Sequence, residues 1–285
     1  MSEEETEVAS PEQLLNIASY FVMSSPTGEV HDVLVDVAKL VNDSSTLNDG
    51  AIQKIMREYN IEQYQPALTP DGHRLIVSAH GQVGVDEYLD PTSGKVLSFD
   101  HRSQKFTGET VKKQALSSNI NTFRTAIEKS LEGYMEAQYK KDKCTITVYG
   151  ADDGLITVCI SARNTHLAAY WTGGWRSTFV LNVTDKGSSE LKCKTNVNVH
   201  YFEEGNVQLH AAIEKVASVQ VTDAESTAAA ITTAIGHYES EFQAAMEEMY
   251  VDMHRTTFKK MRRFLPITKQ PMNWNVHAHN LISGK

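Results

Sequence analysis

Residues 223–265 read DAESTAAAITTAIGHYESEFQAAMEEMYVDMHRTTFKKMRRFL, a stretch with no proline and a single glycine, Gly236. Its apolar residues recur at alternating steps of four and three, at Ile231, Ile235, Tyr238, Phe242, Ala245, Met249 and Met253. This spacing places them along one side of an α-helix. The sequence therefore predicts one long helix that carries a single apolar stripe.

The length of this helix limits where it can pack. Some 40 residues make a rod of roughly 60 Å, longer than the width of the sheet that a chain of 285 residues can supply. We therefore expect the stripe to lie across a surface shared with a second chain. The alternative is a helix that breaks at Gly236 and packs within its own domain, because an internal glycine costs only ~1 kcal/mol.

The end of the predicted helix is basic, in contrast to the rest of the chain. No acidic residue follows Asp252, whereas seven basic residues do, so residues 253–285 carry a charge of +7 within a chain of formal charge −9. Four of them form a basic edge, at Arg255, Lys259, Arg262 and Arg263. This asymmetry indicates that the end binds a negatively charged partner; the alternative is a solvated basic tail without a ligand.

The last twenty residues read as a separate element. Pro266 stops or kinks the helix, and Pro271 can open a short helix. On that helix one face would hold Trp274, Ala278 and Leu281 or Ile282. A tail with a Trp-bearing apolar face predicts a binding element, whereas many chain ends are simply frayed.

The first sixty residues predict three short helices. Turn-forming residues separate apolar residues at helical spacing, which gives helices at 11–24, 30–41 and about 48–59. Short loops between short helices are typical of a small antiparallel bundle.

The middle of the chain predicts antiparallel strands around one helix. Strand candidates with turn residues between them lie at 74–77, 95–99, 144–149, 156–162, 175–183, 191–202 and 207–212. A helix is predicted at about 120–135. Consecutive strands joined by tight turns form a meander, so the predicted class is α+β.

The sequence gives no support to an enzyme and no sign of a cofactor. The pair Gly173-Gly174 is predicted to lie in a turn before a strand, without the following helix that a phosphate loop needs. The pairs Asp152-Asp153 and Glu203-Glu204 fall in predicted turns, where neighbouring carboxylates stay solvated. His277 and His279 have no thiol or carboxylate nearby, so we expect no metal site.

Composition predicts a cytoplasmic protein. Of the residues, 41% are hydrophobic and 22% charged, as in soluble globular chains. The first residues, Met-Ser-Glu-Glu-Glu, are acidic where a secretory signal would be basic and then apolar. The three cysteines, Cys144, Cys159 and Cys193, lack the spacing of a disulfide framework or a zinc site.

Several long strings resemble the F-actin capping protein alpha-subunit family. They are VHYFEEGNVQL (199–209), FKKMRRFLPIT (258–268), YWTGGWRS (170–177), SSPTGEVHDVLVDV (24–37), LDP (89–91) and FDH (99–101). The strings occur in order over nearly the whole chain. Residues 102–116 and the acidic leader match poorly, so the resemblance implies nothing about them.

The resemblance implies an architecture of four parts. It predicts an N-terminal antiparallel three-helix stalk (1–65), a central antiparallel sheet region with an embedded helix (66–221), a long C-terminal helix across the sheet (222–265) and a mobile amphipathic tentacle (266–285). The sheet would continue into a partner, the capping protein beta subunit, to make an obligate heterodimer.

The resemblance also implies a function and a binding site. The dimer would bind actin filament barbed ends without calcium, block the addition and loss of subunits, and associate with the cytoplasmic actin cytoskeleton. The implied actin-binding residues are Arg255, Lys259, Arg262, Arg263, Lys269, Trp274 and Leu281. Lys259 and Arg263 would also bind phosphoinositides, and further implied partners are capping-protein regulators and an actin-related-protein filament.

Two departures from the family pattern bear on this site. Lys269 stands where family members often have Arg, which removes a planar bidentate donor. Lys260 adds a charge where a small residue is usual.

Two other functions remain open. One is a protein that binds anionic lipid or nucleic acid through the basic end; such proteins usually have a basic domain, and this chain carries −9, so nucleic acid is not expected. The other is a scaffold subunit that does not cap, with an inert basic end.

Overall fold

A computed structural model describes residues 9–110, 116–139, 143–184, 186–203 and 206–257. The chain divides into two compact units, residues 1–234 and 235–285. Each unit is described by itself below.

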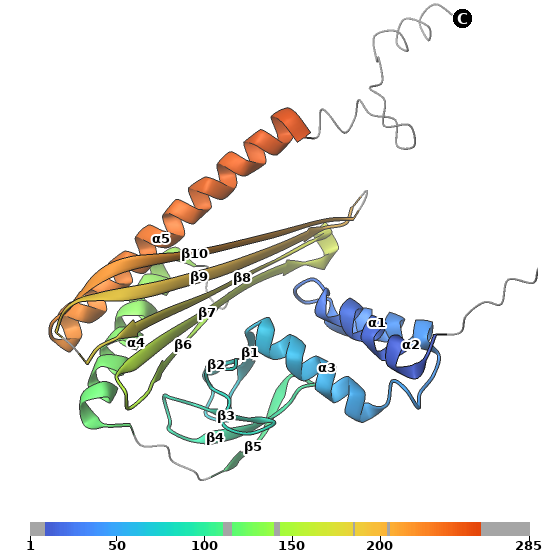
Figure 1. The fold of residues 1–285 in the computed structure, drawn as a ribbon, viewed down its shortest axis with the longest axis horizontal. Coiled ribbons are helices and arrows are strands. Elements are labelled where there is room, and N and C mark those ends of the chain that lie inside the picture. The colour runs from blue at the N-terminus through green and yellow to red at the C-terminus, as the bar shows by residue number, and fades with distance from the viewer. Residues whose placement is uncertain (1–8, 111–115, 140–142, 185, 204–205, 258–285) are drawn as a thin grey trace, which may run out of the picture. The chain divides into compact units, whose positions relative to one another are not determined.

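The first unit begins with three helices, α1 (Pro11–Met23), α2 (Val30–Val41) and α3 (Asp49–Glu62) (Figure 1). Ser10 and Gln13 form a capping box at the start of α1, and the Asn48 side chain caps α3. Asn42 ends α2 in the left-handed conformation. The three helices share a core that includes Ala18, Val22, Leu34, Met56 and Tyr59, and the predicted helices are confirmed.

Two small antiparallel sheets follow the helices. One pairs β1 (Gln65–Leu68) with β2 (Arg74–Val77), and the other has the order β3 (Glu87–Leu89), β4 (Val96–Asp100), β5 (Lys105–Thr110). The sequence predicted β2 and β4 but missed the other three. β1 contains Pro66, β3 has three residues and β5 contains Gly108, so none shows a clear strand signal.

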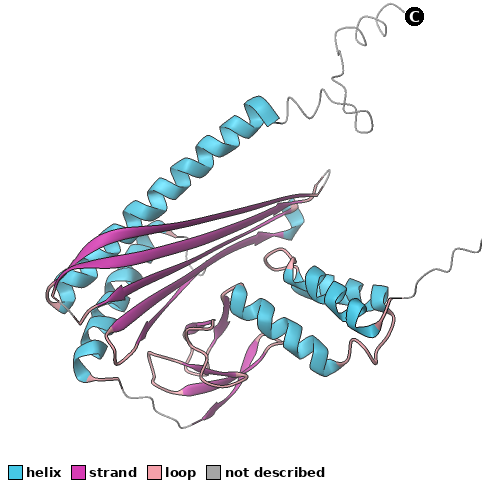
Figure 2. Ribbon diagram, viewed as in Figure 1, coloured by secondary structure: helices cyan, strands magenta, loops and turns pink. Residues whose placement is uncertain are grey.

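The large sheet is an antiparallel meander of five strands in the order β10-β9-β8-β7-β6 (Figure 2). Its strands are β6 (Cys144–Gly150), β7 (Leu155–His166), β8 (Trp171–Asn182), β9 (Gly187–Tyr201) and β10 (Val207–Val221). The predicted meander is confirmed, but most strands are longer than predicted. In the second half of β10 the adjacent polar residues Glu214 and Lys215 interrupt the alternation that marks a strand, so the prediction stopped at residue 212.

The prediction of a turn at Gly173 and Gly174 is wrong. Both lie inside β8, where Gly173 pairs with Asn164 and Gly174 with Arg163. A Cβ on Gly174 would lie 2.4 Å from Oγ1 of Thr27. The loop that precedes α2 therefore packs against the strand, and this close approach explains a glycine within it.

Helix α4 (Ser118–Gln138) packs on β6. Its buried face includes Ile120, Phe123, Ile127 and Leu131, as the apolar spacing predicted. Sγ of Cys144 in β6 lies 3.2 Å from Sδ of Met135 near the end of the helix.

Helix α5 (Ala224–Asp252) is the longest helix described, and a π-helical turn follows it at Met253–Thr257. The helix runs unbroken through Gly236, so the alternative of a break there is wrong. In the first unit, the hydroxyl groups of Thr232 and Ser130 lie 2.8 Å apart and link α5 to α4. The predicted helical residues 258–265 lie outside the described residues.

Candidate functional site

One of the seven predicted actin-binding residues lies in the described part of the chain. Arg255 is exposed in the π-helical turn after α5. The other six, Lys259, Arg262, Arg263, Lys269, Trp274 and Leu281, lie outside the described residues. Their grouping into one site therefore stays a prediction.

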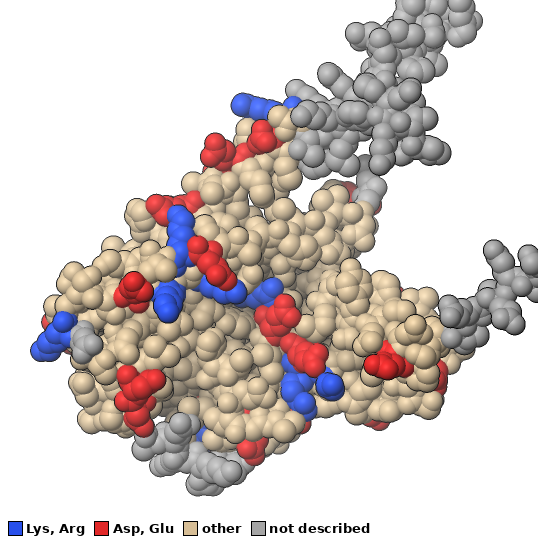
Figure 3. All heavy atoms as spheres, viewed as in Figure 1, with Lys and Arg blue, Asp and Glu red and all other residues tan. Residues whose placement is uncertain are grey.

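The residues of α5 that precede Arg255 are acidic. Glu247, Glu248 and Asp252 occupy the last two turns of α5 before Arg255. Figure 3 shows acidic side chains along this part of the helix, next to the residues that are not described. The sign of the charge therefore changes within one helical turn, as the sequence predicted.

Burial along the α5 stripe is uneven. Ile231, Ile235, Tyr238 and Phe242 are buried, whereas Ala245 is exposed and Met249 and Met253 are only partly buried. Tyr250 and Val251 are exposed as well. The last three turns of the helix thus expose apolar side chains.

Strand β10 forms one edge of the large sheet, paired on one side with β9 in the described residues. It has 15 residues, far more than the mean strand of about five or six. Val207 and Val216 are exposed on it. A long strand at the edge of a sheet can serve as a template for a strand from another chain.

Three of the strings that carry the family resemblance meet at one place. The Glu29 carboxylate accepts a hydrogen bond from Thr172 at 3.1 Å and lies 2.8 Å from Nδ1 of His200. Thr172 and His200 pair across β8 and β9, and Glu29 is the N-cap residue of α2. Sequence reasoning did not single out these residues, because the contact joins positions 171 residues apart.

Two arginines fix the end of α3 to the large sheet. Nη1 of Arg176 donates to the carbonyl oxygen of Glu62, and Nη2 of Arg163 donates to that of Gln63, both at 2.6 Å. Cations stabilise the negative end of a helix dipole. Burial lowers the pKa of Arg163 to about 10 and also lowers the pKa of Arg176.

The FDH string contributes a buried histidine to the small three-stranded sheet. His101 is fully buried, with Nδ1 3.2 Å from Nδ2 of Asn60 and Nε2 3.2 Å from the Tyr88 hydroxyl. Desolvation lowers the pKa of His101 to about 4, although Asp86 at 3.5 Å acts in the opposite direction. The imidazole is therefore neutral at physiological pH and holds α3 to the sheet.

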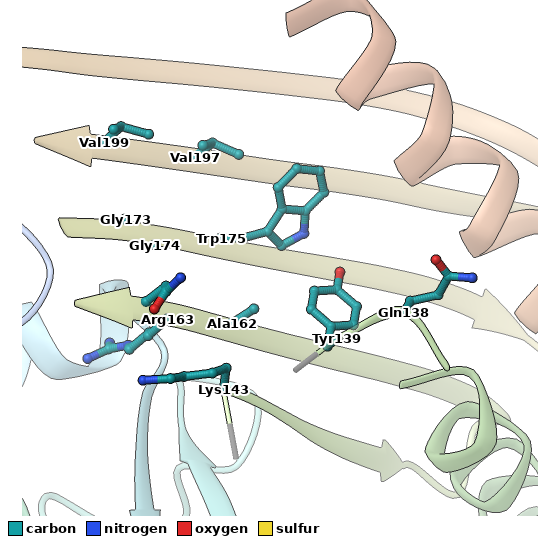
Figure 4. A pocket seen from close by; sticks show the side chains of 11 residues that line it. Gln138, Tyr139, Lys143, Ala162, Arg163, Gly173, Gly174, Trp175, Val197 and Val199 are labelled. Atoms are coloured by element: carbon teal, nitrogen blue, oxygen red, sulfur yellow. The ribbon is translucent and has the colours of Figure 1, made fainter. Parts of the chain in front are cut away.

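An apolar pocket of about 350 Å³ lies over strands β7, β8 and β9 (Figure 4). The glycine at 173 leaves open space in its floor, beside Trp175, Val197 and Val199. Tyr139 lines it from just beyond the end of α4. The pocket has the size and character of a site for apolar side chains.

The described residues form neither a metal site nor a membrane-spanning helix. Asp153 lies in a turn, where its carboxylate accepts from the backbone N–H of Leu155. No group of three His, Cys, Asp or Glu side chains there could hold a metal ion. None of the described helices is long and apolar enough to cross a membrane. Glu204, His277 and His279 lie outside the described residues.

Comparisons with known proteins agree on one family. The family model for the F-actin capping protein alpha subunit matches residues 18–284. The F-actin-capping protein subunit alpha of Dictyostelium discoideum is 35% identical over 275 residues, which cover 94% of this chain and 95% of that protein. The Caenorhabditis elegans protein of the same name is 32% identical, and 95% of each chain is covered.

A solved structure has the same fold. The homodimeric actin capping protein alpha subunit of Plasmodium berghei matches with a TM-score of 0.74 and 21% identity, over 89% of this chain and 98% of that one. At this identity the match speaks for the fold alone.

Proposed function

Because this chain belongs to the F-actin capping protein alpha-subunit family, we propose that it is the alpha subunit of a heterodimer that caps actin filament barbed ends. The family consists of structural actin-binding proteins rather than enzymes. Bound at the barbed end, the dimer blocks both addition and loss of actin subunits, and it does so without calcium. The observation that carries this proposal is the family match over residues 18–284.

The partner pairs with this chain through the large sheet. The long edge of β10 accepts an antiparallel edge strand of the capping protein beta subunit, so that one sheet runs through both chains. The exposed apolar groups at the end of α5 and the apolar pocket over β7–β9 take side chains of that subunit. Supporting this are the exposed apolar side chains of Val207 and Val216 on β10 and of Tyr250 and Val251 at the end of α5.

The basic end makes the actin contact. Arg255, Lys259, Arg262, Arg263 and Lys269 attract the acidic barbed end, while Trp274 and Leu281 insert into an apolar cleft. Lys259 and Arg263 also accept phosphoinositide head groups, which would then compete with actin. The complex acts in the cytoplasm on the actin cytoskeleton, where regulators and an actin-related-protein filament are further partners.

The test is purification followed by an elongation assay. Expressed alone, the chain should be insoluble or oligomeric; expressed with a beta subunit, it should purify as a soluble 1:1 complex. That complex should stop barbed-end growth equally in calcium and in a calcium chelator. A soluble complex that leaves growth unchanged would favour the scaffold function, and a soluble, monodisperse monomer would contradict the obligate heterodimer.

A further inference from the structure

A second cavity lies on the face of the large sheet opposite to the apolar pocket. It has a volume of about 330 Å³ and lies between the end of α3 and strands β8 and β9. Its polar lining residues are Glu62, Tyr64, Arg176, Thr178, Lys194 and Asn196. This volume is within the usual range of small-molecule sites, and none of its lining residues belongs to the predicted actin-binding set.

The strand register gathers four of these polar residues into one block. Arg176 and Thr178 alternate along β8, and Lys194 and Asn196 alternate along β9. Arg176 pairs directly with Asn196, and Thr178 pairs with Lys194. Paired and alternating residues share a face of the sheet, so both cations and both neutral side chains line the cavity together.

Arg176 has no ion-pair partner among the described residues, although the Glu62 carboxylate in the same lining partly offsets the lowering of its pKa by burial. No carboxylate oxygen in the described part of the chain lies within ion-pair distance of its guanidinium. Nη1 donates to the Glu62 carbonyl, and Nε is buried with no hydrogen-bond partner among the described residues. A guanidinium removed from water is stabilised by an anion that accepts its hydrogen bonds.

The neighbouring groups can donate to the same anion. The Lys194 ammonium lies 2.7 Å from Glu214, but both side chains are more than half exposed, and such surface pairs are weak. The hydroxyl groups of Tyr64 and Thr178 are 2.6 Å apart, and burial raises the pKa of Tyr64, so the phenol keeps its proton. The lining contains one carboxylate, that of Glu62. Glu62 is exposed, so water screens its repulsion of an anion in the cavity.

We propose that this cavity binds a small soluble phosphate monoester, whose phosphate group is held by Arg176, Lys194 and Asn196. The cavity holds about ten times the ~30 Å³ that one water occupies, which leaves room for an organic body beside the phosphate. Bound there, the ligand joins the end of α3 to β8 and β9. It therefore stabilises the attachment of the N-terminal helices to the sheet.

Calorimetry on the full-length chain in complex with its beta subunit tests the proposal. Glycerol 3-phosphate and inorganic phosphate serve as the two probes, with chloride at equal ionic strength as the blank. We expect saturable 1:1 binding of both, tighter for the monoester. Equal affinity for the two would overturn the claim of a monoester site, and absence of saturable heat would overturn the site altogether.

Three variants locate the binding. Lys194→Gln and the isosteric Asn196→Asp should each weaken binding by about tenfold. The first removes a charge-assisted hydrogen bond, and the second places a carboxylate that repels the phosphate. Lys192→Gln is the matched control, since Lys192 lies two residues from Lys194 on the same strand but does not line the cavity. Equal loss in Lys192→Gln would show diffuse attraction and overturn the proposal.

Two checks keep the result interpretable. A thermal melt of each variant complex shows whether it folds. If Asn196→Asp does not fold, Lys194→Gln alone tests the site, because Lys194 is exposed and its substitution should not disturb folding. Lys259→Ala with Arg263→Ala should leave phosphate binding unchanged. Loss of binding in that double variant would assign the phosphate to the basic end and contradict the cavity.

Discussion

At the scale of single residues, the molecule keeps ionisable groups buried where they join its elements. His101 is an example, since it lies at 0% exposure between Asn60 and Tyr88. Its pKa of about 4 is well below its usual 6.5 because the charged imidazolium would lose its hydration. The folded state therefore binds fewer protons than the unfolded state between these two pH values.

This difference predicts a loss of stability in mild acid. Neutral His101 contributes to the free energy of unfolding, and this contribution is fully present above about pH 6.5. It is lost as the pH falls toward 4, and the loss amounts to at most about 3 kcal/mol. His101→Gln should flatten the pH dependence of the melting temperature of the complex between these values. His31→Gln, at an exposed position of α2, is the control, and identical profiles for wild type and His101→Gln would refute the assignment.

A neighbouring pair of glycines provides a second prediction at this scale. A Cβ on Gly174 would lie 2.4 Å from Oγ1 and 3.3 Å from Cβ of buried Thr27, whereas a Cβ on Gly173 would meet nothing closer than 3.9 Å. Gly174→Ala should therefore destabilise the complex by about 1–3 kcal/mol, and Gly173→Ala should not. Chemical denaturation of the two variants measures the difference, and equal midpoints would contradict the close approach.

At the scale of elements, the sequence predicted what depends on local periodicity. The four-and-three stripe of α5, and the apolar spacing and turn residues of the first sixty residues, located helices correctly. Strand ends were harder, because the adjacent polar residues Glu214 and Lys215 interrupt the alternation in β10, and Gly174 is typical of a turn until Thr27 is placed beside it. Of the predicted site, the structure describes Arg255 alone, in the π-helical turn after α5 and not within a continuous α-helix as predicted. Contacts between distant segments, such as Glu29 with His200, have no local signal.

The basic end gives the prediction that belongs to this scale. Long-range attraction speeds association and is screened by salt, whereas apolar contacts mainly slow dissociation. Lys259→Ala with Arg263→Ala should lower the capping on-rate strongly and reduce its dependence on salt. Kinetics of barbed-end growth at two salt concentrations measure both effects.

A control must separate this site from general loss of charge. Lys129→Ala with Lys192→Ala removes two exposed positive charges from α4 and β9 instead, and it should leave the on-rate nearly unchanged. If the Lys259–Arg263 variant capped as fast as wild type at low salt, the electrostatic role of the basic end would be wrong.

At the scale of the whole molecule, the chain has the features of one half of an assembly. The edge of β10 spans 15 residues, and the end of α5 exposes Tyr250 and Val251. We propose that a beta subunit covers both surfaces, so that the sheet and α5 serve assembly and the end of the chain serves filament binding.

The most direct measurement is the growth of single actin filaments observed by microscopy with the purified alpha–beta complex. Our account predicts that nanomolar complex arrests barbed ends, with neither growth nor shortening, while pointed ends on the same filaments continue to exchange subunits. It also predicts that a complex truncated after Asp252 binds poorly and releases quickly. Barbed ends that keep growing at saturating complex would contradict the account.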